Sequence, residues 1–334
     1  MTTMMRGLAR PILLLVAGIA LPLALQAADL GFYISFASRV LIYALAATSL
    51  NLVLGYGGMV AFGHAAFVGA GAYFSSIALV EGLASAWIGW PLAVAGAALA
   101  ALAIGALSLR TRGVYFIMIT LAFAQMAYYL VNSMKAYGGD EGLTLPSRAE
   151  IGFGLDLGNE VTFYFVVLAC LAASLYALHR LVDARFGRAL VAIRENEARA
   201  EALGYATVRI KLAAFVLAGG VAGLAGALLA SHGKYVNPNV LHWTQSGTLL
   251  VMVILGGVGR LWGGVLGAAA LLLLEHFFAE FRIGWLAELA PNYQQHAALG
   301  VGLVLLAVVL FAPQGIAGIL DAARARVTGK PRHA

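Results

Sequence analysis

The chain has 334 residues, of which 62% are hydrophobic and only 11% are charged, and its mean hydropathy is +0.90. Soluble domains carry roughly 25% charged residues, so this composition excludes a water-soluble globular protein and indicates a polytopic helical membrane protein. The apolar runs are continuous and do not alternate, which disfavours a transmembrane barrel. The net charge of +6 therefore reports membrane topology and not affinity for nucleic acid.

Taken in chain order, the apolar runs predict an all-α fold with about ten transmembrane helices. The predicted spans are residues 11–28, 32–54, 64–80, 87–109, 113–133, 161–179, 212–230, 246–258, 261–279 and 295–312. The first run also has the shape of a signal peptide, but it lacks a clean small residue at position −3. We therefore favour an uncleaved span.

The run 246–258 is too short for a complete crossing. Its residues, at about 1.5 Å each, extend roughly 20 Å, whereas the hydrocarbon core is ~30 Å thick. The helix either begins earlier, near Trp243, or is a half-helix shielded by protein. The predicted number of crossings is therefore eight to ten.

The basic residues orient these spans. With the N-terminus inside and ten crossings, 16 of the 21 Lys and Arg residues face the cytoplasm, as the positive-inside rule requires. The exceptions are Arg39, Lys135, Arg148, Lys234 and Arg282. The domain prediction is a cytoplasmic N-terminus (1–10), a transmembrane domain (11–316) that includes a cytoplasmic loop at 180–211, and a basic cytoplasmic tail (317–334).

A glycine-rich run occupies residues 51–73. Each glycine weakens a helix by about 1 kcal/mol relative to Ala, so Gly55–Gly58 favour a helix break. One interpretation is an interrupted helix beside a translocation pathway, and the other is a tight turn followed by a glycine face that packs against a neighbour. His64 is expected to make a structural hydrogen bond, because no partner stands at metal-ligand spacing.

Two further glycine-rich stretches follow. Residues 138–145 lie in the predicted outer loop and form either a solvated turn or the outer mouth of a pathway, and residues 256–267 repeat the glycine-rich theme in the second half. The candidate pathway residues are Asn51, Gly55, Tyr56, Gly58, Gly63, His64, Gly139 and Gly142.

The longest polar run, residues 187–213, is compatible with one charged helix and lies between two spans. Ala198, Ala202 and Leu203 share one face, and Gly204 follows at the position that ends many helices. Such a helix either docks in a groove of another protein or is a solvated linker. The chain has no phosphate-binding GxxxxGK[ST] loop and no carboxylate series across the membrane, so we expect a partner to supply the energy.

Four stretches, 192–204 (AIRENEARAEALG), 49–73, 110–126 and 256–268, closely resemble the permeases of ABC importers for branched-chain amino acids. The match is to the M-type subunit of this LivH/LivM permease family, and GGDEGL at 138–143 resembles the GG-T-GL turn of the family. The resemblance covers most of residues 40–316. It implies a non-catalytic permease subunit in the inner membrane of a bacterium.

The resemblance also implies partners. These are a second, H-type permease, two cytoplasmic ATPase subunits that use ATP and Mg, a periplasmic binding protein and membrane lipid. No cofactor or metal is implied for this chain itself. Members of the family also carry urea, short amides and aromatic acids, and substrate choice is expected to rest largely with the binding protein.

The ATPase-coupling helix implied by the resemblance consists of Arg194, Glu195, Asn196, Glu197, Ala198, Glu201, Ala202, Leu203 and Gly204. The sequence departs from the simplest EAA pattern, because Arg199 follows Glu197-Ala198. A stand-alone channel or secondary carrier would need an ion-coupling residue at mid-membrane. An integral-membrane enzyme would need a polar catalytic cluster at one interface, and the sequence contains neither.

Overall fold

The computed structural model describes residues 18–22, 31–152, 156–280, 297–312 and 314–319. Most of the predicted first span and of the basic tail lies outside these residues. The helices that precede the polar loop are α2 (Phe32–Asn51), α3 (His64–Val80), α4 (Ala86–Ser108), α5 (Val114–Ser133) and α6 (Glu160–Asp183). Those that follow are α7 (Arg185–Glu195), α8 (Glu197–Ala202), α9 (Thr207–Gly233), α10 (Trp243–Gly256), α11 (Leu261–Glu280) and α13 (Ala297–Phe311). The short elements are η1 (Leu52–Tyr56), η2 (Lys135–Tyr137), β1 (Leu143–Thr144), β2 (Tyr235–Val236) and η3 (Pro238–Leu241).

Within the described residues, six helices are long and apolar enough to cross a membrane, and three shorter apolar helices accompany them. The spans predicted from residue 32 onward correspond to helices. The two spans that flank the polar loop are longer than predicted, because their helices continue through charged residues that can extend into water beyond the hydrocarbon. The short run begins at Trp243, which is one of the two alternatives that the sequence left open.

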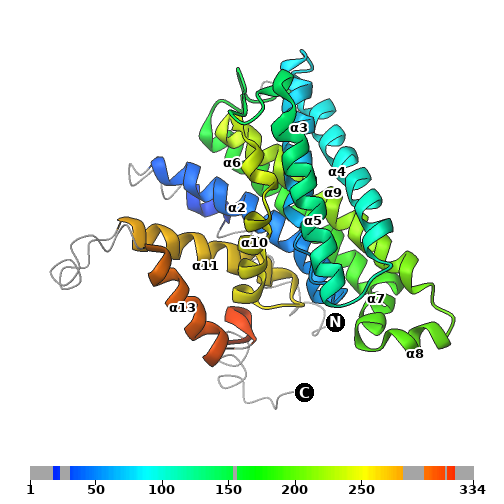
Figure 1. Ribbon diagram of the computed structural model, residues 1–334. Helices are drawn as coiled ribbons and strands as arrows, with labels where there is room; N and C mark the ends of the chain where they lie inside the picture. Colours follow the sequence, from blue (N-terminus) through cyan, green and yellow to red (C-terminus); the bar gives the residue numbers. More distant parts are fainter. Residues whose placement is uncertain (1–17, 23–30, 153–155, 281–296, 313, 320–334) are drawn as a thin grey trace.

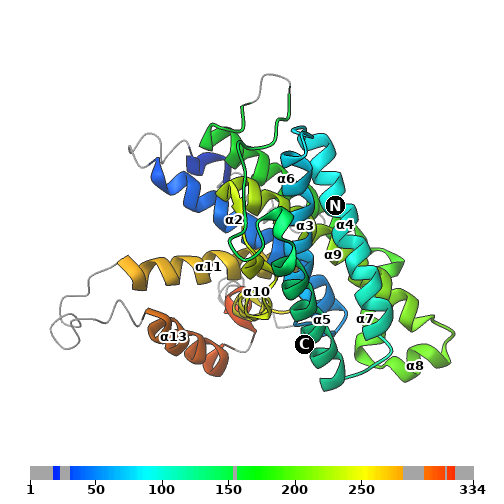
Figure 2. The same ribbon diagram turned by 45° about the horizontal axis from the view of Figure 1, so that its top comes forward.

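Helix α9 lies at the centre of the bundle and packs against α2, α3 and α4 (Figure 2). The contact with α3 depends on glycine: a Cβ atom on Gly71 would overlap the backbone of Gly223, and one on Gly226 would overlap the carbonyl group of Val68. Small residues allow such close approach between helices in lipid. The interpretation of residues 63–71 as a glycine packing face is therefore confirmed.

One end of the bundle is closed by contacts between distant loops. β1 pairs antiparallel with β2, with Leu143 opposite Val236. These strands come from the loops 134–160 and 231–245, which the predicted topology places on the same, outer side. Helices α7 and α8 project from the opposite end of the molecule (Figure 1).

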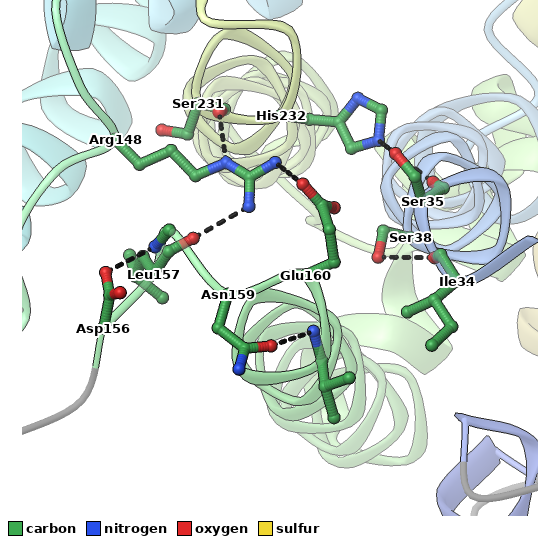
Figure 3. Close-up of polar contacts among 12 residues, drawn as sticks. Ile34, Ser35, Ser38, Arg148, Asp156, Leu157, Asn159, Glu160, Ser231 and His232 are labelled. Atoms are coloured by element: carbon green, nitrogen blue, oxygen red, sulfur yellow. Dashed lines mark hydrogen bonds and ion pairs between the residues drawn. The ribbon is translucent and has the colours of Figure 1, made fainter. Parts of the chain in front are cut away.

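Arg148 fixes the end that carries the strands (Figure 3). Its guanidinium group donates to the carbonyl oxygens of Ser231 (3.1 Å) and Leu157 (2.8 Å) and pairs with Glu160 Oε1 at 2.5 Å. The group also lies 4.4 Å from the centroid of the Phe163 ring. Arg148 is one of the five basic residues on the predicted outer side, and because it is buried and paired it does not oppose the charge bias.

We expect Gly71→Val to destabilise the protein, because the added side chain would separate α3 from α9. Overpacking of this kind costs typically 1–3 kcal/mol. The measurement is the thermal midpoint of the detergent-purified chain, followed by size-exclusion chromatography. Gly302→Val on α13 is the matched control, since nothing lies within 4 Å of its added Cβ atom. Equal midpoints for both variants would contradict the packing argument.

Candidate functional site

The two glycine-rich turns predicted in separate halves of the chain meet in space. Asn51 is fully buried at the end of α2, and its Nδ2 donates to the carbonyl oxygen of Arg260 at 2.6 Å. Its Oδ1 accepts a hydrogen bond from the backbone N–H of Gly259 at 2.9 Å. A Cβ atom on Gly55 would lie 2.7 Å from Gly259 Cα, so the side chain of Asn51 and the glycines together hold the turns in contact.

The helix break expected at Gly55–Gly58 lies at the end of that run. The helix continues through Gly55 as the π-helical turn η1, and the chain turns at Gly58, where φ is +67°. The predicted break is therefore confirmed at Gly57 and Gly58, whereas Gly55 remains helical because the backbone of η1 keeps its own hydrogen bonds. Residues 57–63 then form an irregular segment that leads into α3.

Arg194 connects this pair of turns to the polar loop. It lies in the last turn of α7, and its Nη1 donates to the carbonyl oxygen of Gly55. Its aliphatic stem covers Gly58, where an added Cβ atom would lie 2.6 Å from Arg194 Cγ. A residue that the sequence assigned to the coupling loop thus contacts two residues that the sequence assigned to the pathway.

The composition of the polar run suggested a single helix, but the structure shows more than one. The run divides into α7, α8 and the first turns of α9, with Asn196 in an extended conformation (φ −156°, ψ 99°) between α7 and α8. The Asn196 side chain accepts a hydrogen bond from the N–H of Arg199 at 2.9 Å and so caps α8. Asn at this position favours a new helix start over helix continuation.

Charged residues hold α8 against the rest of the protein. Glu197 Oε1 lies 2.5 Å from Lys211 Nζ on α9, and its Oε2 lies 3.6 Å from Nε of Arg112. Glu201 accepts a hydrogen bond from Thr207 Oγ1 at 2.9 Å and lies 3.5 Å from Arg112 Nη2. Both carboxylates therefore point inward.

Three apolar residues in and directly after α8 are exposed, and the exposed Arg199 lies among them. They are Ala198, Ala202 and Leu203, here termed the α8 face, and Leu203 is 73% exposed. Gly204 follows with φ +86°, as expected for the residue that ends a helix. The geometry offers a small apolar surface on a short, firmly held helix. Glu195 lies exposed at the end of α7.

The other candidate pathway residues lie in different places. His64 is fully buried at the start of α3, and its Nε2 lies 2.8 Å from Ser49 Oγ, which confirms the expected structural hydrogen bond. Gly139 and Gly142, both with positive φ, lie in the loop beside β1, where Tyr235 donates to the Glu141 carbonyl oxygen. No group of His, Cys, Asp and Glu in the described part of the chain could hold a metal ion.

The sequence interpretation missed three hydroxyl side chains that serve the irregular backbone around the start of α3. Thr120 Oγ1 accepts from the N–H of Phe62 at 3.2 Å, and Ser246 Oγ accepts from the N–H of Ala65 at 2.8 Å. Ser49 binds His64, as described above. The sequence shows each of these residues only as a hydroxyl side chain within an apolar run. That pattern does not identify the group to which the hydroxyl binds.

Comparisons with known proteins agree with one another. Residues 32–312 match the model of a family described as "Branched-chain amino acid transport system / permease component". The high-affinity branched-chain amino acid permease protein LivM of Salmonella typhimurium is 30% identical over 85% of this chain and 69% of its own length. LivH of Escherichia coli K12 is 25% identical over 83% of this chain and 91% of its own. An autoinducer 2 import permease, LsrC of Salmonella paratyphi B, is 32% identical over 46% of this chain and 42% of its own. No solved structure matches the chain.

We expect Asn51→Ala to lower the thermal stability of the purified chain. The substitution leaves the Gly259 N–H and the Arg260 carbonyl oxygen without their side-chain partner, at a cost of about 1–3 kcal/mol for each buried group. Gln125→Ala is the control, because Gln125 is a polar side chain within a span that makes no hydrogen bond to the described residues. An unchanged thermal midpoint for Asn51→Ala would show that the two turns hold together without this amide.

Proposed function

Because the chain belongs to the family of permease components of branched-chain amino acid transport systems, we propose that it is a membrane-spanning subunit of an ATP-driven importer. The protein is a multi-pass membrane protein, and we place it in the bacterial inner membrane. In this proposal it carries no catalytic residue and no cofactor. Two separate cytoplasmic ATPase subunits use ATP and Mg, and a second, H-type permease and a periplasmic binding protein complete the importer.

The observation that carries the proposal is the α8 face. A helix that is anchored from behind by Glu197 and Glu201, but presents exposed Leu203, is built to be contacted by another protein. We assign this surface to the groove of an ATPase subunit. Leu203 is 73% exposed and Tyr205, two residues farther on, is 46% exposed, so more than one large apolar side chain is exposed at this end of α8.

Arg194 connects the proposed docking surface to the membrane helices. When the ATPase subunits approach each other, a displacement of α7 and α8 acts through Arg194 on the turn at Gly55. Asn51 then carries the displacement to Gly259 and the start of α11. The helices α2 and α11 are the first to respond in this proposal.

The proposed topology has ten crossings with both termini in the cytoplasm. It is supported by the contacts, because Arg112, Arg194 and Arg260 belong to segments assigned to one side and meet the same cluster of turns and short helices. The loops assigned to the other side meet in the β1–β2 ladder. No described contact joins loops assigned to opposite sides.

We propose branched-chain amino acids as the substrate, because the named transport systems of LivM and LivH carry them. The similarity to an autoinducer 2 import permease keeps other small solutes as the alternative within the same family, including urea, short amides and aromatic acids. The binding protein is expected to make most of this choice.

The experiment that tests the proposal is a pull-down of the tagged chain from native membranes. Recovery of a second permease and of ATPase subunits is the expected result. Leu203→Asp should remove the ATPase subunits and retain the second permease, because a carboxylate in an apolar groove is left without a partner. Leu203→Met is the matched control and should retain both. Recovery of the chain alone, still moving solute without ATP, would favour a stand-alone carrier or channel and exclude the importer.

We expect Gly204→Val to reduce uptake while membrane insertion stays near normal. A β-branched residue at φ +86° is strained by roughly 1–2 kcal/mol, which would distort the end of α8. Gly204→Asn is the control, since Asn tolerates this conformation better. The measurement is ATPase activity stimulated by loaded binding protein, together with substrate uptake. Equal activity of the two variants would refute the role of this glycine in docking.

A further inference from the structure

A cavity of about 40 Å³ lies inside the bundle between α2, α3, η3, α9 and α10. Its volume is roughly three times the ~10–15 Å³ that a water-sized probe needs, so the cavity admits a group of about three heavy atoms. Most of its wall is aliphatic and includes Ile42, Val68, Leu229 and Leu249. A branched hydrocarbon group of isopropyl size fits this description in both volume and polarity.

The cavity lies near the middle of the membrane. Ile42 and Ala46 flank the midpoint of the span Tyr33–Tyr56. Two helices begin beside the cavity, because Ala65 is the second residue of α3 and Gln245 is the third residue of α10. Irregular backbone at membrane depth occurs where protein buries it or where it lines a cavity, and transporters bind their substrates at such places.

Two polar groups at the cavity have no hydrogen-bond partner among the described residues. They are the side-chain amide of Gln245 and the hydroxyl group of Tyr43, both half-buried. By contrast, Ser246, the residue next to Gln245, binds the backbone of α3. An amide offers both a donor and an acceptor, which is what the ammonium and carboxylate groups of one zwitterion require.

Charged side chains stand one turn farther outward. The Arg39 guanidinium lies 5.7 Å from the centroid of the Tyr43 ring, and Glu275 on α11 is within electrostatic range of Arg39. Both side chains belong to membrane spans and are exposed on the surface of this subunit. Charges in spans are costly in lipid and usually face protein or water.

We infer that the cavity receives the branched end of an aliphatic amino acid side chain during the passage of that amino acid through the importer. The branched side chain lies between Ile42, Val68 and Leu249, and the amide of Gln245 and the hydroxyl of Tyr43 bind the polar end. This inference rests on the proposed function and adds to it a place where the permease itself senses the side chain.

The test uses the full chain, expressed in a strain that lacks it, and measures uptake of radiolabelled leucine and valine. Ala46→Val reduces the cavity, so leucine uptake should fall about tenfold more than valine uptake, the scale expected for one methylene group in an apolar pocket. Gln245→Leu should lower uptake of both roughly 10–100-fold, because a hydrogen bond to a charged group is lost. Ala95→Val on the exposed face of α4 is the control for added volume.

The same variants are then purified with their partner subunits, and ATPase stimulation by loaded binding protein is measured. Stimulation should persist, because the cavity does not contact α8. Wild-type uptake of leucine and valine by both cavity variants would overturn the site and leave the proposed function intact. Parallel loss of uptake and ATPase stimulation would assign these residues a purely structural role. Absence of amino acid uptake by the wild-type importer would overturn the proposed substrate and the site together.

Discussion

A backbone that leaves a helix inside a membrane must be hydrogen-bonded by the protein itself, and this constraint organises the molecule. Asn51 supplies both a donor and an acceptor to the turn before α11. Thr120 and Ser246 each supply an acceptor to a backbone N–H around the start of α3. These three side chains bind four backbone groups of the two irregular segments. The glycines provide the space, and the polar side chains provide the partners.

Features that depend on local composition, such as the positions of the spans, could be predicted from the sequence. Contacts between residues far apart in the chain could not. Apolar runs located the spans from residue 32 onward, and the positive φ of Gly204 followed from its place after a short helix. Asn196 ended the expected long helix, because one side chain that captures the N–H of Arg199 outweighs the helical preference of its neighbours. The meeting of Gly55 with Gly259 joins residues more than 200 positions apart, and no periodicity encodes such a pairing.

The candidate coupling site combines two kinds of interaction with different purposes. Carboxylates at Glu197 and Glu201 pair with basic residues and a hydroxyl group of the same chain, so they hold α8 in place. The α8 face has no such contact with the described residues and is the surface that we propose binds another protein. Arg194 then links the end of α7 to a carbonyl oxygen in a membrane helix. The site thus connects an exposed surface to the helix bundle.

The burial of Arg148 has a consequence for biosynthesis. Leu157 and Glu160, two of its partners, follow within 12 residues, whereas Ser231 lies 83 residues farther along the chain. In a protein made from its N-terminus onward, this guanidinium is therefore synthesised well before its third acceptor. Until α9 has entered the membrane, the nascent permease carries an incompletely satisfied cation at this end. The insertion of α9 completes the cluster. A chain truncated before Ser231 lacks the carbonyl oxygen that accepts from Arg148 Nε.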